Sequence, residues 1–396
     1  MALDFTRVIK QIGEMAVRLK TARNERLERV SKAISVLRGQ ADRLDPLKKK
    51  IAQSKTTWLV AEPVEKLDAR HALPPVPRDF TVIATDGSHI DVDRHHAVHC
   101  YLINIGSVVL TYGAHPDALL ESHPVVYSDS ADLVIASPDG LREVPVEGNL
   151  LGMKRSAEEA RIMAEVAGEL PAGSTAVGLM DGTLIMWNLE AYPEFVTERI
   201  LDQGYLAHLE DIRKLNGDRK IAIAAYISHP GSTDVVNAMR VALCPLDFVD
   251  SDRCPDCNTR ECRAISGVLD RELFAGLLAI GERSGLFISP SRIQKRYGRQ
   301  LVHFFYLRVD GEIARVEVPR WVVEDRTWLE LVHSVVVDQC RRGQGYPVAL
   351  SEAHEKAVVT GVDRDTFWRM VEESLVEEHL PVTESEKNRS KRTRWV

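Results

Sequence analysis

Apolar strands alternate with amphipathic helices through the middle of this 396-residue chain, and that alternation restricts its fold more than any other feature. A pair of strands comes first, and helices and strands then follow one another. This order is typical of a mixed α/β sheet flanked by helices. The expected strands are residues 81–85, 99–105, 175–180, 220–228, 301–309 and 313–323, and the expected helices are 151–170, 193–216, 234–243, 270–280, 327–341, 351–360 and 363–377.

Two of these strands end in the same way. TVIAT runs into Asp86-Gly87-Ser88, and AVGLM runs into Asp181-Gly182-Thr183. A carboxylate at the carboxyl end of a buried strand is held rigidly at the sheet edge, where ligands gather. The glycine beside it lets a backbone or a phosphate approach closely. Asp86 and Asp181 are therefore candidate site residues, and the alternative for each is a plain Asp-Gly turn.

The helix at 151–170 carries one acid inside its apolar face. On a wheel of about 100° per residue, Glu158 and Glu165 fall on the polar side, whereas Glu159 lies within the apolar arc. That arc contains Met153, Ala157, Ala160, Met163, Ala164, Ala167 and Leu170. A buried carboxylate is costly unless it meets a cation or a metal, so we expect Glu159 to face the sheet and join Asp86 and Asp181. The alternative is a boundary residue that reaches water or pairs with an arginine.

Three carboxylates from two strands and one helix form a hard, oxygen-rich site. Such a site suits Mg²⁺ or Mn²⁺ rather than zinc. Two ions about 4 Å apart would clamp the attacking and leaving oxygens of a phosphodiester displacement. The sequence contains no GxxxxGK[ST] loop, so it does not encode a P-loop motor.

The cysteines suggest a second metal site. Cys254, Cys257 and Cys262 follow the spacing C-x2-C-x4-C, and Cys244 lies ten residues earlier. Four thiolates on one polar loop fit tetrahedral Zn²⁺, and the alternatives are an iron–sulfur cluster or unliganded thiols. Zinc would clamp a Cys-rich insertion at 244–266. The two remaining cysteines, Cys100 and Cys340, lie among apolar residues and are expected to be buried.

Charge is unevenly spread along the chain. Residues 1–55 contain fourteen Lys or Arg against six Asp or Glu, although the whole chain has a net charge of −7. Apolar residues recur there at helical spacing, which predicts one long or two stacked amphipathic helices whose stripe must bury against the body or a second protomer. We therefore expect a basic helical extension at 1–70, a linker at 62–78, a main domain at 75–380 and a basic tail at 381–396.

The N-terminal sequence, the distribution of apolar residues and the net charge indicate where the protein is located and how strongly it binds DNA. MALDFTRVIKQIGEM lacks the apolar core of a signal peptide, and no run of about 18 uncharged apolar residues occurs. These features predict a cytoplasmic protein without a membrane span. The net negative charge argues against strong DNA binding by the whole surface, so weak DNA affinity of the chain alone is expected.

In their order and spacing, several motifs resemble the NurA-domain nucleases. The first are Asp86-Gly87-Ser88 and LMDGTLI around Asp181. Asp270-Arg271 with Phe274, GERSGLF at 281–287 and FFYLRVDGEIARVEVPRWV at 304–322 follow. The last is GYPVALSEAHEKAVV at 345–359. The resemblance covers about residues 75 to 375.

The resemblance implies an RNase H-like core and a manganese-dependent nuclease. Members of the family degrade DNA from 5′ ends, cut single strands, form a homodimer with a central channel, and act with a hexameric HerA-type ATPase. Carried over by motif, Asp86 and Asp181 match the two strand acids, and His354 matches the histidine near the metal. The helix acid is less closely defined, so Glu159 is assigned from the wheel, with Glu158 and Glu165 as alternatives.

His354 and Arg315 also have readings of their own. His354 is spaced by four residues from both Leu350 and Val358, which places it on the core side of a helix. It is a satisfied core histidine or, as a neutral imidazole, a Mn²⁺ ligand. Arg315 and Glu317 alternate with valines on one strand face. This face is either a solvent face with salt bridges or, in the case of Arg315, a surface that contacts DNA. Ser88 is also predicted to contact DNA.

Aromatic residues could in principle stack DNA bases, but in strands they are more often core. The candidates are Phe304, Phe305, Tyr306, Trp321 and Trp328.

Taken together, the sequence predicts a divalent-metal-dependent DNA nuclease that processes DNA ends, a 5′–3′ exonuclease and single-strand endonuclease. Asp86, Glu159, Asp181 and His354 form its site, with a HerA-type ATPase as partner. The leading alternative is a catalytically silent scaffold subunit that binds DNA ends or the translocase. A third is a zinc-stabilised interaction module without a role on DNA.

Overall fold

The chain forms two compact units in a computed structural model that describes residues 3–93, 96 and 98–380. One unit comprises 74–226, 292–302 and 317–396, and the other comprises 1–73, 227–291 and 303–316. Below they are called the sheet unit and the N-terminal unit. The expected extension at 1–70 is thus part of a larger body, while the expected tail at 381–396 lies outside the described residues. No helix in the described part of the chain is long and apolar enough to cross a membrane.

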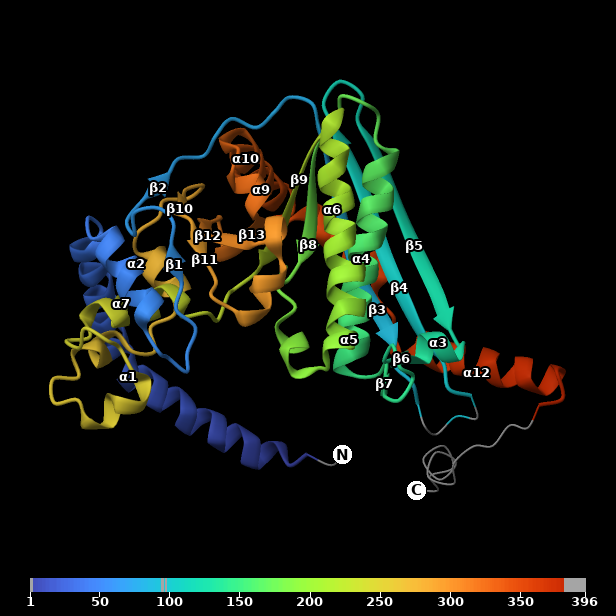
Figure 1. Ribbon diagram of the computed structural model, residues 1–396, viewed down its shortest axis with the longest axis horizontal. Helices are drawn as coiled ribbons and strands as arrows, with labels where there is room; N and C mark the ends of the chain where they lie inside the picture. The colour runs from blue at the N-terminus through green and yellow to red at the C-terminus, as the bar shows by residue number, and fades with distance from the viewer. Residues whose placement is uncertain (1–2, 94–95, 97, 381–396) are drawn as a thin grey trace. The chain divides into compact units, whose positions relative to one another are not determined.

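The sheet unit is built on five strands in the order β5-β4-β3-β8-β9 (Figure 1). Strand β4 is antiparallel to both neighbours, whereas β3, β8 and β9 run parallel. Three antiparallel strands followed by parallel ones reached through helices is the arrangement of an RNase H-like sheet, so the expected fold class is confirmed. The strands are β3 (Phe80–Ile90), β4 (Tyr101–Tyr112), β5 (Asp117–Tyr127), β8 (Thr175–Asp181) and β9 (Lys220–Ile227).

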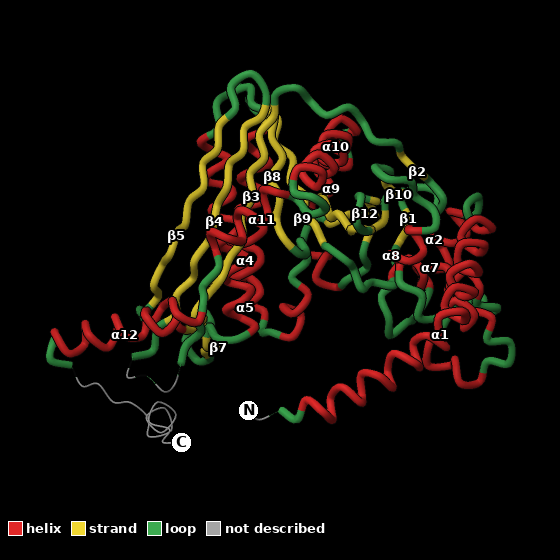
Figure 2. The backbone as a smooth tube through the Cα atoms, turned by 180° about the vertical axis from the view of Figure 1, so that it is seen from behind, coloured by secondary structure: helices red, strands yellow, loops and turns green. Residues whose placement is uncertain are grey.

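Helices cover both faces of this sheet. Helix α4 (Asn149–Glu169) contacts β3 and β4 on one face, and α11 (Val348–Ala357) contacts β3, β4 and β5 on the other (Figures 1 and 2). The two faces follow from strand alternation, because Gly87 lies against α4 and Gly106, the cross-strand partner of Asp86, lies against α11. The apolar side of α4 packs into the main core with Ile83.

Further helices complete the sheet unit. The expected helix at 193–216 is α5 (Glu194–Thr197), a π-helical segment η2 (Glu198–Tyr205) and α6 (Leu206–Lys214). The expected strand at 313–323 ends at Pro319, and α9 (Arg320–Val323) begins there. Other elements of the unit are α3 (Ser130–Leu133), β6 (Val134–Ala136), β7 (Glu143–Pro145), η1 (Trp187–Ala191), η3 (Leu215–Gly217), η6 (Arg292–Arg296), η7 (Gly298–Gln300), α10 (Arg326–Arg342) and α12 (Gly361–Glu377).

Strand β3 is longer than expected. Asp86 was expected to end a strand, but β3 continues to Ile90 and pairs with β4 throughout, so that prediction is wrong for Asp86. The expectation is confirmed for Asp181, the last residue of β8. There Gly182 takes a positive φ of 84°, which turns the chain away from the sheet.

The N-terminal unit combines long helices with short strands around Phe274, Phe287 and Phe304. The expected linker at 62–78 is wrong in its first part, since β1 and β2 form there and Leu67 is buried. The expected helix at 270–280 ends at Ala275. The elements are α1 (Phe5–Gln40), α2 (Leu44–Gln53), β1 (Glu62–Pro63), β2 (Arg70–His71), α7 (Asp234–Leu243), η4 (Ser251–Asp256), η5 (Glu261–Ile265), α8 (Asp270–Ala275), β10 (Arg283–Ser284), β11 (Phe287–Ile288), β12 (Val302–Arg308) and β13 (Ile313–Pro319), whose terminal residues extend into the sheet unit.

The first part of α1 keeps its apolar stripe uncovered. Ile9, Ile12 and Leu19 are exposed, whereas Ala33 and Leu37 near the other end of the helix are buried in the core. Burial of the whole stripe against the body, one of the two expected outcomes, is therefore not observed in the described chain.

Gly106 allows α11 to approach the sheet, and its substitution tests this packing. A Cβ there would overlap the carbonyl oxygen of Ala353 and lie 2.6 Å from the nitrogen of Ala357, both backbone atoms. We expect Gly106→Ala to lower the free energy of unfolding by about 1–3 kcal/mol. The control Gly168→Ala, in open space on α4, should raise it by about 0.5–1 kcal/mol. Urea unfolding measures both, and equal effects would contradict the packing.

Candidate active site

Asp86 and Asp181 lie side by side on neighbouring strands. Thr85 of β3 pairs with Met180 of β8 in parallel register, so the next residue of each strand is an aspartate at the same level. Neighbouring strands are about 4.8 Å apart. The Asp86 carboxylate is only partly exposed and accepts a hydrogen bond of 2.8 Å from the backbone N–H of Gly87. Two adjacent carboxylates thus project from the middle of the sheet.

Each aspartate has one side-chain partner from the C-terminal part of the chain. His354 Nδ1 on α11 lies 2.8 Å from Asp86 Oδ2, and the Tyr346 hydroxyl donates a 2.8 Å hydrogen bond to Asp181 Oδ1. Burial, followed by the nearby Asp181 charge, raises the pKa of Tyr346 well above its usual range, so the phenol stays a donor. The expected core position of His354 is wrong, because its side chain is 62% exposed.

Tyr346 was not singled out from the sequence. It stands in the loop before α11, eight residues ahead of His354 and directly before Pro347. That proximity to the start of the helix is the signal that could have indicated it. Its ring also meets Tyr226 edge to face, with centroids 5.5 Å apart.

Glu159 reaches the same region from α4. It is 6% exposed, and its approach depends on Gly87, where a Cβ would lie only 2.5 Å from Glu159 Oε1. Arg155 Nε lies 3.1 Å from that oxygen, close enough for an ion pair, yet neither atom has a hydrogen-bond partner. The predicted burial of Glu159 is confirmed.

The three carboxylates influence one another. Burial raises the pKa of Glu159 to about 8; the positive charge of Arg155 opposes this rise, and the negative charges of Asp86 and Asp181 add to it. The group is therefore largely protonated at neutral pH unless a cation joins the site.

The two alternative helix acids lie elsewhere. Arg161 pairs with Glu158 at 2.7 Å and with Glu165 at 2.5 Å. Glu158 lines a different cavity, beside Lys154 and His208. Of the three glutamates, Glu159 is therefore the one placed to act with Asp86 and Asp181.

A cleft opens beside these acids. Its volume is about 380 Å³, and Glu159 and Asp181 form part of its wall. The remaining wall comes from α4 and the residue before it, from β3, from the segment after β8 and from the end of η2, and includes His89, Gly148, Asn149, Gly152, Arg155, Thr183, Met186, Trp187, Asn188 and Tyr205. This volume is at the small end of the range for small-molecule sites.

The chemistry of the acids fits a divalent cation. Asp86, Glu159 and Asp181 offer only oxygen ligands, and Glu159 Oε1 is buried without a hydrogen bond, a costly state that a cation would relieve. Among the described residues, however, no three His, Cys, Asp or Glu side chains are already gathered in a way that could hold a metal ion. His354 and Tyr346 bond to two of the carboxylates instead.

The expected exposed face of the strand with Arg315 is wrong. Arg315 is 3% exposed, pairs with Asp234 at 3.1 Å and stacks over the Phe304 ring at 3.6 Å. Its burial is incompatible with the expected DNA contact. Glu317 is also buried and accepts hydrogen bonds from the Thr183 hydroxyl and the Leu184 N–H, which fixes the chain after Asp181.

Asp270, from the motif Asp270-Arg271 with Phe274, has a structural role in the N-terminal unit. Its carboxylate accepts hydrogen bonds from the backbone N–H groups of Val235 and Val236 at the start of α7, and from the Tyr306 hydroxyl. Burial, together with the Asp234 charge, raises the pKa of Asp270 to about 7.

The other residues that the sequence suggested as DNA contacts differ in how deeply they are buried. Phe304, Phe305 and Tyr306 are fully buried, so they are core residues. Trp321 and Trp328 meet edge to face at 5.6 Å and are partly exposed. Ser88 is half-buried inside β3, opposite Asn104.

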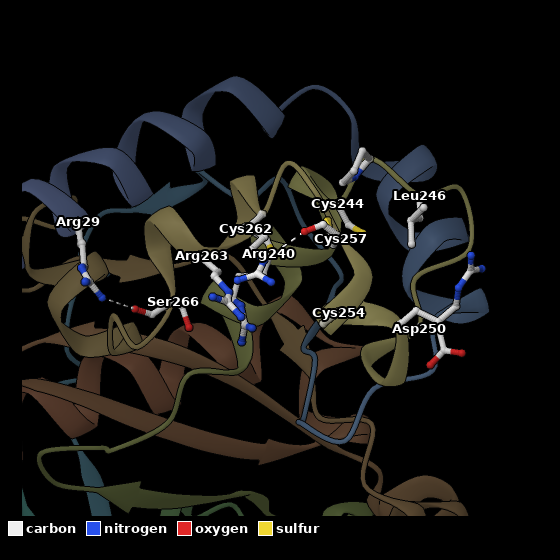
Figure 3. Close-up of a pocket in the computed structure, with 13 residues that line it drawn as sticks. Arg29, Arg240, Cys244, Leu246, Asp250, Cys254, Cys257, Cys262, Arg263 and Ser266 are labelled. Atoms are coloured by element: carbon white, nitrogen blue, oxygen red, sulfur yellow. Dashed lines mark hydrogen bonds between the residues drawn. The ribbon is translucent and has the colours of Figure 1, made fainter.

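The four loop cysteines line one cavity of the N-terminal unit, of about 490 Å³ (Figure 3). None is in a disulfide, and Arg29, Arg240, Arg253, Arg260 and Arg263 share the cavity wall. Burial, and the proximity of the other three thiols, raises the pKa of Cys262. Zinc at Cys244, Cys254, Cys257 and Cys262 stays a prediction, which metal analysis of the purified chain would check. Cys100 and Cys340 are buried, as expected.

The strand order and the acids on its central strands define an RNase H-like α/β protein with an acidic cleft. The model of the NurA domain family matches residues 80–359, which include Asp86, Glu159, Asp181 and His354. The chain belongs to the NurA domain family.

Comparison with solved structures gives weaker likenesses. The NurA nuclease from Sulfolobus solfataricus aligns over 93% of this chain and 98% of its own, with 12% identity and a TM-score of 0.46. LC9-RNase H1, a type 1 RNase H with the type 2 active-site motif, aligns over 42% of this chain and 71% of its own, with 11% identity and a TM-score of 0.21. No curated protein matches the chain.

The raised pKa of Glu159 predicts how the free energy of unfolding changes with pH. The unfolded group ionises near 4.5 and the folded one near 8, so between these values the folded state binds more protons and stability falls as pH rises. Without divalent cations, Glu159→Gln should remove this fall, at most about 1.4 kcal/mol per pH unit. Urea unfolding from pH 5 to 8 measures the difference from wild type.

The matched control for that measurement is Glu158→Gln, which removes the neighbouring carboxylate already paired with Arg161. A difference between wild type and Glu159→Gln that stays constant with pH would contradict the raised pKa of the buried Glu159 carboxyl group.

Proposed function

We propose that this chain is a divalent-metal-dependent DNA nuclease. Membership of the NurA domain family supports a nuclease, and one observation supports the assignment to specific residues: Asp86 and Asp181 stand at the same level on neighbouring strands, and their charges add to the rise in the pKa of the buried Glu159. Oxygen-only ligands favour Mn²⁺ or Mg²⁺.

Each site residue has a distinct role in this proposal. Asp86, Glu159 and Asp181 would hold the metal, which when bound activates water and stabilises the charge that develops on the phosphate. Tyr346 fixes the orientation of Asp181 through its hydroxyl. His354 orients Asp86, and because its ring is exposed it can turn toward the metal or give a proton to the leaving oxygen.

The finer activity comes from the family resemblance. We propose 5′–3′ exonuclease and single-strand endonuclease activity on DNA ends, together with a hexameric HerA-type ATPase that supplies translocation. The net charge of −7 supports a need for a partner or a closed channel, since the chain's overall charge opposes DNA.

The proposal predicts the effect of removing single carboxylates. Asp86→Asn, Asp181→Asn and Glu159→Gln should each reduce Mn²⁺-dependent cleavage of end-labelled single-stranded DNA by at least about 100-fold, because each removes a ligand without changing side-chain volume. Glu165→Gln, an exposed acid on the same helix as Glu159, is the matched control and should retain wild-type activity.

The same assay separates enzyme from scaffold. If the wild-type chain cleaves no DNA with Mn²⁺ or Mg²⁺, with or without a HerA-type ATPase, the nuclease proposal fails and the silent scaffold stands. End-labelling either the 5′ or the 3′ terminus reports the direction of degradation.

We also propose a homodimer in which a second copy covers the exposed stripe of α1. Ile9, Ile12 and Leu19 recur at helical spacing and are exposed, and an uncovered apolar stripe of this kind is typical of an interaction surface.

A charge placed in this stripe tests the dimer. Ile12→Glu should weaken dimerisation, since it buries a carboxylate in an apolar contact. The control Gln11→Glu adds the same charge on a different side of α1. Sedimentation velocity of the full chain measures the monomer fraction, and a wild-type chain that is monomeric at tens of micromolar would contradict the proposal.

A further inference from the structure

Half of the buried polar side-chain atoms that lack a hydrogen-bond partner in the described chain lie around one cleft. They are His89 Nδ1, Arg155 Nε, Glu159 Oε1 and Tyr205 OH, and their residues all line the 380 Å³ cleft at the carboxylate site. Arg155 Nε and Glu159 Oε1 face one another at 3.1 Å as an ion pair, so His89 Nδ1 and Tyr205 OH are the two atoms of this group without a partner. Buried polar groups normally find partners, so two unpaired ones beside one cleft indicate room for a ligand. Tyr205 is the clearest case, because it is only 1% exposed.

The amino end of α4 faces the same cleft. Gly148, Asn149 and Gly152 line it, and a Cβ built on either glycine meets nothing within 4 Å, so there is room beside the helix end. The first turn of this 21-residue helix contains no acidic residue, although the Asp91 carboxylate accepts a 3.1 Å hydrogen bond from the N–H of Gly148, the residue before the helix. The N-terminus of a long helix favours an anion.

Two side chains that could donate to a ligand, Arg155 and His89, line this cleft together with Glu159 and Asp181. Arg155 lies one turn before Glu159 on α4; its Nε is buried beside Glu159, while its side chain as a whole is 31% exposed, which leaves part of it accessible to a ligand. His89 follows Asp86 by three residues on β3. The donors of Arg155, His89 and Tyr205 thus share one cleft with Glu159 and Asp181.

Two further lining residues could accommodate the rest of a nucleotide. Trp187, half-buried, and Asn188, exposed, come from the segment directly after Asp181 and Thr183. An indole face stacks on any base, and an amide can bond to a sugar or a base edge. Phosphate donors at one end and an aromatic wall are together what a nucleotide of a single strand requires.

We propose that the α4 end of this cleft is a phosphate-binding subsite for the DNA strand, formed by Arg155, His89, Tyr205 and the first turn of α4. The inference rests on the proposed nuclease function, and names the group of the substrate that the site holds. The phosphate is either the 5′-terminal monoester or an internal phosphodiester, which have the same donors.

Binding without metal tests the subsite apart from cleavage. Fluorescence anisotropy in EDTA, at one fixed salt concentration, compares oligothymidylates with a 5′-phosphate and with a 5′-hydroxyl. Arg155→Met should weaken binding at least about tenfold, and Tyr205→Phe several-fold, because each removes hydrogen bonds to a charged group. The control Arg161→Met lies on the same helix but is already paired with Glu158 and Glu165. It should change binding less than about twofold.

The two substrates distinguish the source of the phosphate. A wild-type preference for the 5′-phosphorylated strand that disappears in the variants supports the terminal monoester. Equal binding of both strands, weakened in both by the variants, supports an internal phosphodiester. If Arg155→Met fails to fold, as judged by circular dichroism, Tyr205→Phe decides, since it removes one oxygen only.

Two binding results would overturn the proposed phosphate subsite. Wild-type binding that neither Arg155→Met nor Tyr205→Phe changes by more than about twofold overturns the subsite, as does the absence of any binding in EDTA. If the variants weaken binding as expected but the wild-type chain cleaves no DNA with Mn²⁺, the nuclease proposal fails while the subsite stands. If the wild-type chain cleaves DNA but the variants bind it as tightly as wild type, the subsite fails while the nuclease proposal stands.

Discussion

The close contact between Glu159 on α4 and Gly87 on β3 is the constraint on which the site depends. Because Gly87 has no side chain, the helix lies near enough to the sheet to bury a carboxylate beside two others. Burial and the charges of Asp86 and Asp181 then leave Glu159 with a strong preference for a proton or a cation. The local packing of two elements thereby creates the electrostatic property that we assign to catalysis.

The partners of the two aspartates come from a distant part of the sequence. Tyr346 and His354 frame the start of α11, and α11 reaches the sheet because Gly106 leaves room for its backbone. A glycine on each face of the sheet therefore admits one functional helix, α4 on one side and α11 on the other. The carboxylates lie between these helices, which explains how residues about 270 positions apart form one site.

The helical period of α4 was read correctly from the sequence, whereas the positions of His354 and Arg315, which depend on packing between elements, were not. The wheel identified Glu159 because a helix with one buried face has a fixed period. Arg315 was misplaced, because alternating charges suggest a solvent face whereas here Asp234 and Phe304 neutralise and cover the arginine. Asp86 lies within a strand because β4 is long enough to extend the pairing past Gly87. Tyr346 lies in the motif at 345–359, but its hydrogen bond to Asp181 is visible only in the tertiary structure.

The central claim is that Asp86, Glu159 and Asp181 jointly bind a divalent cation. A titration of Mn²⁺ into the full chain at pH 8, followed by the electron paramagnetic resonance signal of free Mn²⁺, measures this directly. The account predicts that the wild-type chain removes the free-ion signal at micromolar Mn²⁺, and that Asp86→Asn and Asp181→Asn abolish this binding. Mn²⁺ binding that is equal in wild type and both variants, or absent from all three, would contradict it.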